Sequence, residues 1–189
     1  MAVCWLGYST DIVATRCCGT QMKKQRVRPP TDEENADINV KRNSGLKRSG
    51  ITKDAAPADV AQAADEYVDA QQIDRSKYLK GFYLLVFHDP QGIIDEVGTA
   101  WGDQLVRAFG WKWQYIIGES DFERAVASPD NAFAVFPGNY LGNMLKPPFD
   151  DVTLMLMFNM IQAVKLPEIR AGALEDISDG RLRHIIPKR

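Results

Sequence analysis

Cysteine and histidine are scarce in this chain of 189 residues, and their scarcity excludes several kinds of site. There are three cysteines (Cys4, Cys17 and Cys18), an odd number that does not suit a secreted disulfide framework. The two histidines, His88 and His184, leave no Cys/His spacing of the kind that binds zinc. We therefore expect reduced thiols, a reducing compartment such as the cytoplasm, no metal site and no cofactor.

Long apolar runs are missing as well. The longest, over residues 152–157, contains Thr153 and is far shorter than the roughly 20 residues that a membrane helix needs. Residues 1–15 have no cationic leader before an apolar core, and Asp11 interrupts the apolar residues there. These features predict a soluble, cytoplasmic protein with no secretory signal and no membrane partner.

The strong local signatures of catalysis do not occur in the sequence. It has no G-x-S-x-G elbow, no Walker-type phosphate loop, no H-E-x-x-H pair and no EF-hand loop. We accordingly assign no catalytic residue. An enzyme, most simply a hydrolase, stays an alternative if carboxylates or His88 come together from separate segments. That alternative predicts a concave pocket lined by His88 or by at least two of the acidic residues named below.

Charge is unevenly divided along the chain, although the formal net charge is only −2. Residues 1–53 hold ten Lys/Arg and five Asp/Glu, whereas residues 54–189 hold 13 Lys/Arg and 20 Asp/Glu. Residues 20–53 are also free of aromatic side chains, a composition that buries too little apolar surface to offset chain entropy. We therefore predict a basic, largely flexible N-terminal arm over residues 1–53 and a single domain over residues 54–189.

The cations of this arm raise a second alternative, nucleic-acid binding, because clustered lysines and arginines can contact phosphates. The sequence disfavours it, since the acidic body would repel a polyanion and no aromatic residue between Thr20 and Lys53 can stack on bases. The cations concerned are Lys23, Lys24, Arg26, Arg28, Lys41, Arg42, Lys47 and Arg48.

Apolar periodicity predicts the elements of the body. Between Gly92 and Phe109 the apolar residues fall on one helical arc, and Gly110 ends that helix. Alternating aromatic residues and tight turns predict three strands, over 111–117, 122–127 and 132–136. Further helices are expected from Pro57 and from Ser76 through Leu85 until Asp89-Pro90 ends it, with a buried strand over 82–87 as the alternative to the latter. Two more are expected over 139–146 and over 152–165, the last as a central, buried helix. The predicted fold class is α+β, with helices packed on a short three-stranded antiparallel meander.

Two groups of residues in the body have both a packing and a binding interpretation. Gly98 and Gly102, four residues apart in the predicted helix, permit the close approach of another backbone, within the fold or in a dimer. Trp101, Trp111 and Trp113 form the densest aromatic group and are either core residues or interface anchors. We expect both groups to pack inside the fold.

Acidic residues of the body are the candidate partner-binding residues. Three lie on the polar side of the 92–109 helix, and three surround the first hairpin turn. Nothing in their spacing requires catalysis or a metal ion, so a solvated face and a docking surface for a cationic protein are the remaining interpretations. The six residues are Asp95, Glu96, Asp103, Glu119, Asp121 and Glu123.

Three segments of the body together resemble small bacterial domains of uncharacterised function. They are Val97–Asp103, Phe109-Gly110-Trp111-Lys112-Trp113 and Phe133–Pro137. In those domains a G-x-x-x-G helix ends in G-W-x-W, leads into a strand meander and closes on a hydrophobic residue and a proline. Some proteins of this kind are immunity partners of interbacterial toxins. The resemblance covers residues 91–165 and implies no catalytic residue. It implies instead a protein that neutralises a toxin by direct binding.

Overall fold

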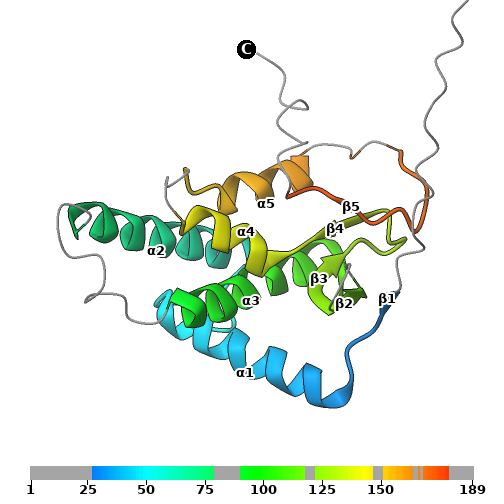
Figure 1. Ribbon diagram of the computed structural model, residues 1–189, viewed down its shortest axis with the longest axis horizontal. Helices are drawn as coiled ribbons and strands as arrows, with labels where there is room; N and C mark the ends of the chain where they lie inside the picture. The colour runs from blue at the N-terminus through cyan, green and yellow to red at the C-terminus, as the bar shows by residue number, and fades with distance from the viewer. Residues whose placement is uncertain are drawn as a thin grey trace, which may run out of the picture.

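The computed structural model describes residues 27–78, 90–117, 122–146, 151–163, 166 and 168–178. Across these residues the chain forms five helices and one sheet of five strands (Figure 1). The helices are α1 (Asp32–Arg48), α2 (Pro57–Tyr78), α3 (Pro90–Phe109), α4 (Pro137–Met144) and α5 (Leu154–Ala163). The strands are β1 (Val27–Arg28), β2 (Lys112–Ile117), β3 (Phe122–Ala127), β4 (Phe133–Val135) and β5 (Glu175–Asp176).

The sheet contains the predicted meander but extends beyond it on both sides. Its order is β1-β2-β3-β4-β5; the first four strands pair antiparallel, and β5 pairs parallel to β4. The α+β class is therefore confirmed, whereas the prediction of a three-stranded antiparallel sheet is wrong. Strands β1 and β5 have two residues each, Val27–Arg28 and Glu175–Asp176, which is too short to show the alternation that predicts a strand.

Helix α3 is the centre of the molecule. It buries ten of its 20 residues and contacts α1, α2 and α4 as well as β3. In Figure 1, α1 lies along one side of α3, and α4 and α5 lie on the other. Helix α5 was expected to be the central helix, but its Leu156 is 48% exposed and its neighbours are mainly α2 residues. The apolar residues that encircle α5 thus include a solvent-facing part, which periodicity alone does not distinguish from a buried one.

Packing inside the fold is confirmed for both residue groups of α3 and β2. A Cβ atom at Gly98 would lie 3.2 Å from the carbonyl oxygen of Pro137, and one at Gly102 only 2.7 Å from the ring of Trp113. Trp101 is fully buried, and its indole Nε1 donates to the carbonyl oxygen of Leu154 at 3.2 Å. The two glycines therefore let the start of α4 and the sheet approach α3 closely.

Residues 27–48 belong to the segment that was expected to be largely flexible, yet they form β1 and α1. Thr31 and Glu34 make a capping box at the start of α1, and basic residues occupy its last turn, in agreement with the helix dipole. Along its length α1 packs on α3. The composition of α1 does not indicate this order, because the charges that offset its own belong to α3. The domain boundary at residue 54 stays a prediction.

Several predictions concern residues outside the described ranges. These are the ones made for the three cysteines, for both histidines, for residues 79–89, for Glu119 and for Asp121. Within the described ranges, none of the helices combines the length and the apolar character that crossing a bilayer requires.

Candidate functional site

The acidic side of α3 is covered by the basic half of α1. Each of the three carboxylates predicted there lies in an ion pair with a cation of α1. The pairs are Lys41–Asp95 at 3.9 Å, Arg42–Asp103 at 3.6 Å, and Arg48–Glu96. The basic arm and the acidic body therefore neutralise one another here, and this side of α3 is not an open acidic face. A partner-binding role of these three carboxylates stays a prediction.

Asp103 is the most buried of these carboxylates, with only 7% of the residue exposed. Burial raises the pKa of its carboxyl above the ordinary value, while the positive charges of Arg42 and Arg107 act in the opposite direction. Arg107 is itself held in place, because it donates to the carbonyl oxygen of Ala55 at 2.9 Å. Arg42 is thus the counter-ion that α1 supplies to a carboxylate at the edge of the core.

A glycine lets α1 approach α3 closely enough for these pairs to form. A Cβ atom at Gly45 would lie 2.1 Å from the carbonyl oxygen of Glu96 and 2.8 Å from Cβ of Ala100. Real Cβ contacts do not occur at the first distance, so any side chain at this position must push the two helices apart.

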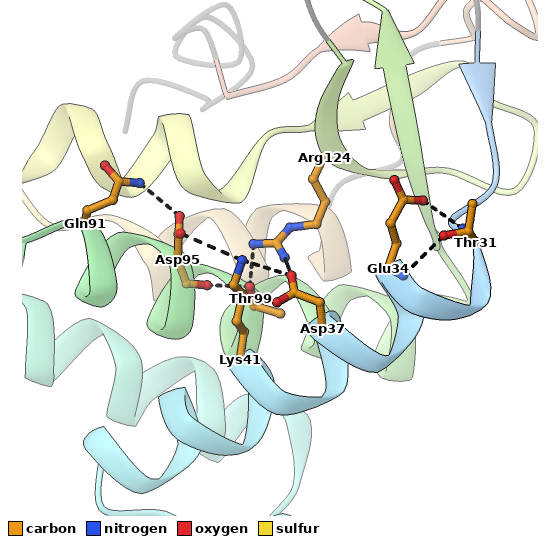
Figure 2. Close-up of polar contacts among 8 residues, drawn as sticks. All are labelled: Thr31, Glu34, Asp37, Lys41, Gln91, Asp95, Thr99 and Arg124. Atoms are coloured by element: carbon orange, nitrogen blue, oxygen red, sulfur yellow. Dashed lines mark hydrogen bonds and ion pairs between the residues drawn. The ribbon is translucent and has the colours of Figure 1, made fainter.

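Arg124 of β3 joins the sheet to both helices (Figure 2). Its Nη2 donates to Oγ1 of Thr99 on α3 at 2.7 Å, and its Nη1 lies 3.6 Å from a carboxylate oxygen of Asp37 on α1. The same Asp37 oxygen lies 2.9 Å from Nζ of Lys41 in an ion pair, and Lys41 also pairs with Asp95. Three elements therefore meet in one chain of alternating charges: Arg124, Asp37, Lys41 and Asp95.

A groove of about 1020 Å³ lies on the other side of Asp95 and Arg124. Residues of α3, α4 and α5, together with strands β3 and β5 of the sheet, line it. One part of its wall is apolar and rich in thioethers, and it includes the exposed side chain of Leu156. The apolar lining residues include Ile94, Met144, Leu156, Met157, Met160 and Ile177.

Charged groups line the same groove. Its carboxylates are Asp95, Glu123, Asp151 and Asp176, and its cations are Arg124 and Lys146. Most of them already have partners within the fold. Glu123 accepts from the side-chain amide of Asn139 at 3.1 Å, and Asp176 accepts from the backbone N–H of Ser178 at 2.8 Å. Asp151 is exposed and makes no hydrogen bond or ion pair with the described residues.

Of the six predicted acidic residues, Asp95 and Glu123 line the groove together. This meets the geometric requirement that the enzyme alternative set, namely a concave pocket with at least two of the named carboxylates. The described residues contain no group of three or more His, Cys, Asp or Glu side chains placed to hold a metal ion.

The groove also contains residues that the sequence analysis did not select. Met157 and Met160 were assigned to a fully buried helix, and Asp176 lies in a segment without a recognisable pattern. The one usable signal is the spacing of Met157 and Met160, three residues apart, which places two flexible thioethers on one face of α5. Comparison of the chain with protein-family models, with curated proteins and with solved structures found no match.

Of the eight cations considered for nucleic-acid binding, Lys23, Lys24 and Arg26 lie outside the described residues, and four of the other five are paired within the fold. Arg28 forms a two-fold hydrogen bond with Glu34, at 2.6 and 2.7 Å, and Lys41, Arg42 and Arg48 are paired as described above. Lys47 makes no ion pair with the described residues. Because a paired cation must give up its carboxylate before it can bind a phosphate, this arrangement weakens the nucleic-acid alternative further.

Proposed function

We propose that this protein is a protein-binding module and that the groove holds a cationic segment of a partner protein. The proposal rests on two features of the groove taken together. One part of its wall is apolar and includes methionines, and its carboxylates outnumber its cations. Apolar contacts supply affinity, and opposite charge supplies specificity and a faster encounter.

The apolar wall favours a protein segment over a small polar ligand. Leu156 is 48% exposed, and with the partly exposed Ile94 and Met160 it gives the groove an apolar surface that a protein segment can cover. Met160 is partly exposed on the same helix, and its unbranched, polarizable side chain can adapt to the irregular surface of a partner. Met157 lies below it in the core.

The charges of the groove favour a basic partner. Asp95 and Arg124 are already compensated by α1, and Asp176 by its local turn, as shown above. Glu123 accepts from the side-chain amide of Asn139. Of the four carboxylates of the groove, this leaves Asp151 as the one without a partner among the described residues. A lysine or arginine of the partner that reaches Asp151 gains a charge-assisted contact without displacing any described group.

We propose further that the module is of the immunity type, neutralising a cationic bacterial toxin in the cytoplasm by occluding it. The support is the resemblance of residues 91–165 to small bacterial domains that include immunity partners. A protein with this task needs complementary shape and charge rather than catalytic groups, which agrees with the missing catalytic motifs.

The product of the gene adjacent to that of this protein is the first partner to test. Binding should be tighter than about 1 μM, and Asp151→Lys or Met160→Lys should weaken it at least about tenfold. The matched control is Asp59→Lys, which makes the same charge change on the exposed first turn of α2, outside the groove. Binding that is weaker than about 1 μM, or equally reduced by the control, would contradict the proposal.

An enzyme is the second candidate, favoured by the placement of Asp95 and Glu123 in one groove. Two carboxylates can serve as acid and base if a substrate bond lies between them. The variants Asp95→Asn and Glu123→Gln test this against a panel of ester, phosphoester and glycoside substrates. Hydrolysis by the native chain that both variants abolish would favour this candidate over the binding module.

A further inference from the structure

Helix α1 packs on α3 with few buried side chains and with several ion pairs. Of its 17 residues only Ile38, Gly45 and Leu46 are buried. Its ion pairs with α3 and β3 join side chains that remain partly open to water; Lys41, for example, keeps 31% of its side chain exposed. Pairs of this kind contribute little individually and are weakened by salt.

The groove and α1 share two residues. Asp95 and Arg124 line the groove on one side, and on the other they contact Lys41 and Asp37 of α1 (Figure 2). The Lys41–Asp95 distance of 3.9 Å is long for an ion pair, and the Asp95 side chain is 37% exposed. The other oxygen of Asp95, Oδ1, accepts from Nε2 of Gln91 at 3.0 Å, and Gln91 is an exposed residue that also lines the groove. A second cation can reach Asp95 from the groove by replacing this neutral amide.

We propose that Lys41 occupies the position that a cation of the bound partner takes at Asp95, so that partner binding in the groove displaces α1 from α3. The proposal rests on the proposed function, because it specifies how a cationic segment engages that groove. Two like charges at one carboxylate repel each other. An arginine or lysine that contacts Asp95 from the groove therefore weakens the ion pair between Lys41 and Asp95.

Displacement of α1 also enlarges the surface that the partner meets. Once α1 is released, Glu96 and Asp103 lose Arg48 and Arg42 and become available to further cations of the partner. Arg124 loses Asp37 at the same time. The segment that fits this surface resembles the basic half of α1: two adjacent cations, and a small residue where the helices must approach closely.

The contribution of Lys41 to holding α1 on α3 can be tested without any ligand, by backbone amide hydrogen exchange of the full chain. We expect Lys41→Ala to speed exchange of the α1 amides more than about fivefold, and α3 and β2–β4 to keep their protection. Lys47→Ala is the matched control, because Lys47 lies on the same helix without an ion pair to the described residues. Equal α1 exchange in the two variants would overturn the proposal, as would α1 amides that exchange only together with those of α3.

Competition at Asp95 is tested with a labelled peptide of residues 38–50, which carries four cations and no carboxylate side chain. Measured by fluorescence anisotropy, it should bind the full-length Lys41→Ala variant more than about fivefold tighter than the native chain. Asp95→Asn, added to Lys41→Ala, should remove that gain. Equal binding of the peptide to the Lys41→Ala and native chains would overturn the proposed competition between Lys41 and the partner, and would leave the proposed function intact. If the peptide binds none of the proteins, the proposed function fails together with it.

Discussion

The two sides of α3 are held by different forces. On one side α1 buries three of its 17 residues and depends on ion pairs at the acidic residues of α3. On the other side α4 and α5 close the main core, and α5 buries four of its ten residues: Leu154, Met157, Phe158 and Ile161. Salt and pH act on the first side, whereas changes of side-chain volume act on the second.

This difference predicts that the molecule loosens in steps. Ion pairs between partly exposed side chains contribute about 0–1 kcal/mol each, whereas a fully buried leucine contributes several times as much. Helix α1 should therefore detach under conditions in which the core around α3 persists. The predictions that follow test each side, in order of decreasing expected effect.

The largest effect should come from the apolar side, at Leu154. This residue is fully buried beside Trp101, so Leu154→Ala removes core contacts and leaves a cavity. We expect the free energy of unfolding, measured by urea denaturation, to fall by about 3 kcal/mol. Leu156→Ala is the control on the same helix, because Leu156 is 48% exposed, and it should lower stability by less than about 0.5 kcal/mol. Equal losses would mean that α5 is not anchored by the core as described.

An intermediate effect is expected at Gly45, the closest contact between α1 and α3. In Gly45→Ala the added Cβ meets the carbonyl oxygen of Glu96, so the helices must separate, at a cost of about 2 kcal/mol. Gly142→Ala is the matched change within α4, where the new Cβ would lie 3.7 Å from Ile94, an ordinary contact distance. Urea denaturation should show a loss for Gly45→Ala and no loss for Gly142→Ala. The reverse order would show that α1 does not pack closely on α3.

Sequence patterns predicted the parts of the fold in which apolar periodicity is strong. The 92–109 helix, the three strands of the meander and the core position of Trp101 follow from the repeat of apolar residues along one face. Residues 27–48 were assigned to a flexible arm because α1 has almost no apolar stripe. The Thr31-x-x-Glu34 spacing after two prolines was the local signal of a helix start that could have corrected this.

The candidate site was harder to predict, because it depends on which charges face each other. Asp95, Glu96 and Asp103 lie on one side of a helix as predicted, but their partners lie 48 to 61 residues away in the sequence. The opposite net charges of residues 1–53 and 54–189 were taken as two separate properties. In the structure they are the two halves of one interface, a relation that periodicity within a segment does not reveal.

A smaller effect is expected from the counter-ion of Asp103. Arg42→Glu places a second negative charge beside a carboxyl whose pKa burial already raises, and should lower stability by about 1 kcal/mol. Because the native pair is screened by salt, the difference from the native chain should shrink as NaCl rises to about 1 M. Lys47→Glu carries the same charge change without a described partner and should change stability less. If the two variants lose equal stability at low salt, net charge rather than the Arg42–Asp103 pair is responsible.

The smallest expected effect concerns the first turn of α1, where Glu34 bonds to Arg28 and to the backbone N–H of Thr31. These hydrogen bonds lower the pKa of Glu34 from 4.5 to about 2, and the bond from Arg28 makes the largest contribution. A carboxyl whose pKa is lower in the folded protein stabilises the fold above its unfolded-state pKa, and this contribution is lost as the pH falls from 4.5 toward 2. The first turn of α1 should therefore loosen in that range.

The measurement is a titration of the side-chain carboxyl carbon of Glu34 by NMR, in the native chain and in Arg28→Gln. Without the arginine, the strongest contribution to the lowered pKa disappears, so the midpoint should move upward toward 4.5. Lys47→Gln is the control, because it removes a cation of the same helix that does not contact Glu34, and the Glu34 midpoint should then stay where it is in the native chain. A native Glu34 that titrates near 4.5 would show that β1 and the start of α1 are not joined by this pair. The charge-held side of α3 would then begin only at Asp37.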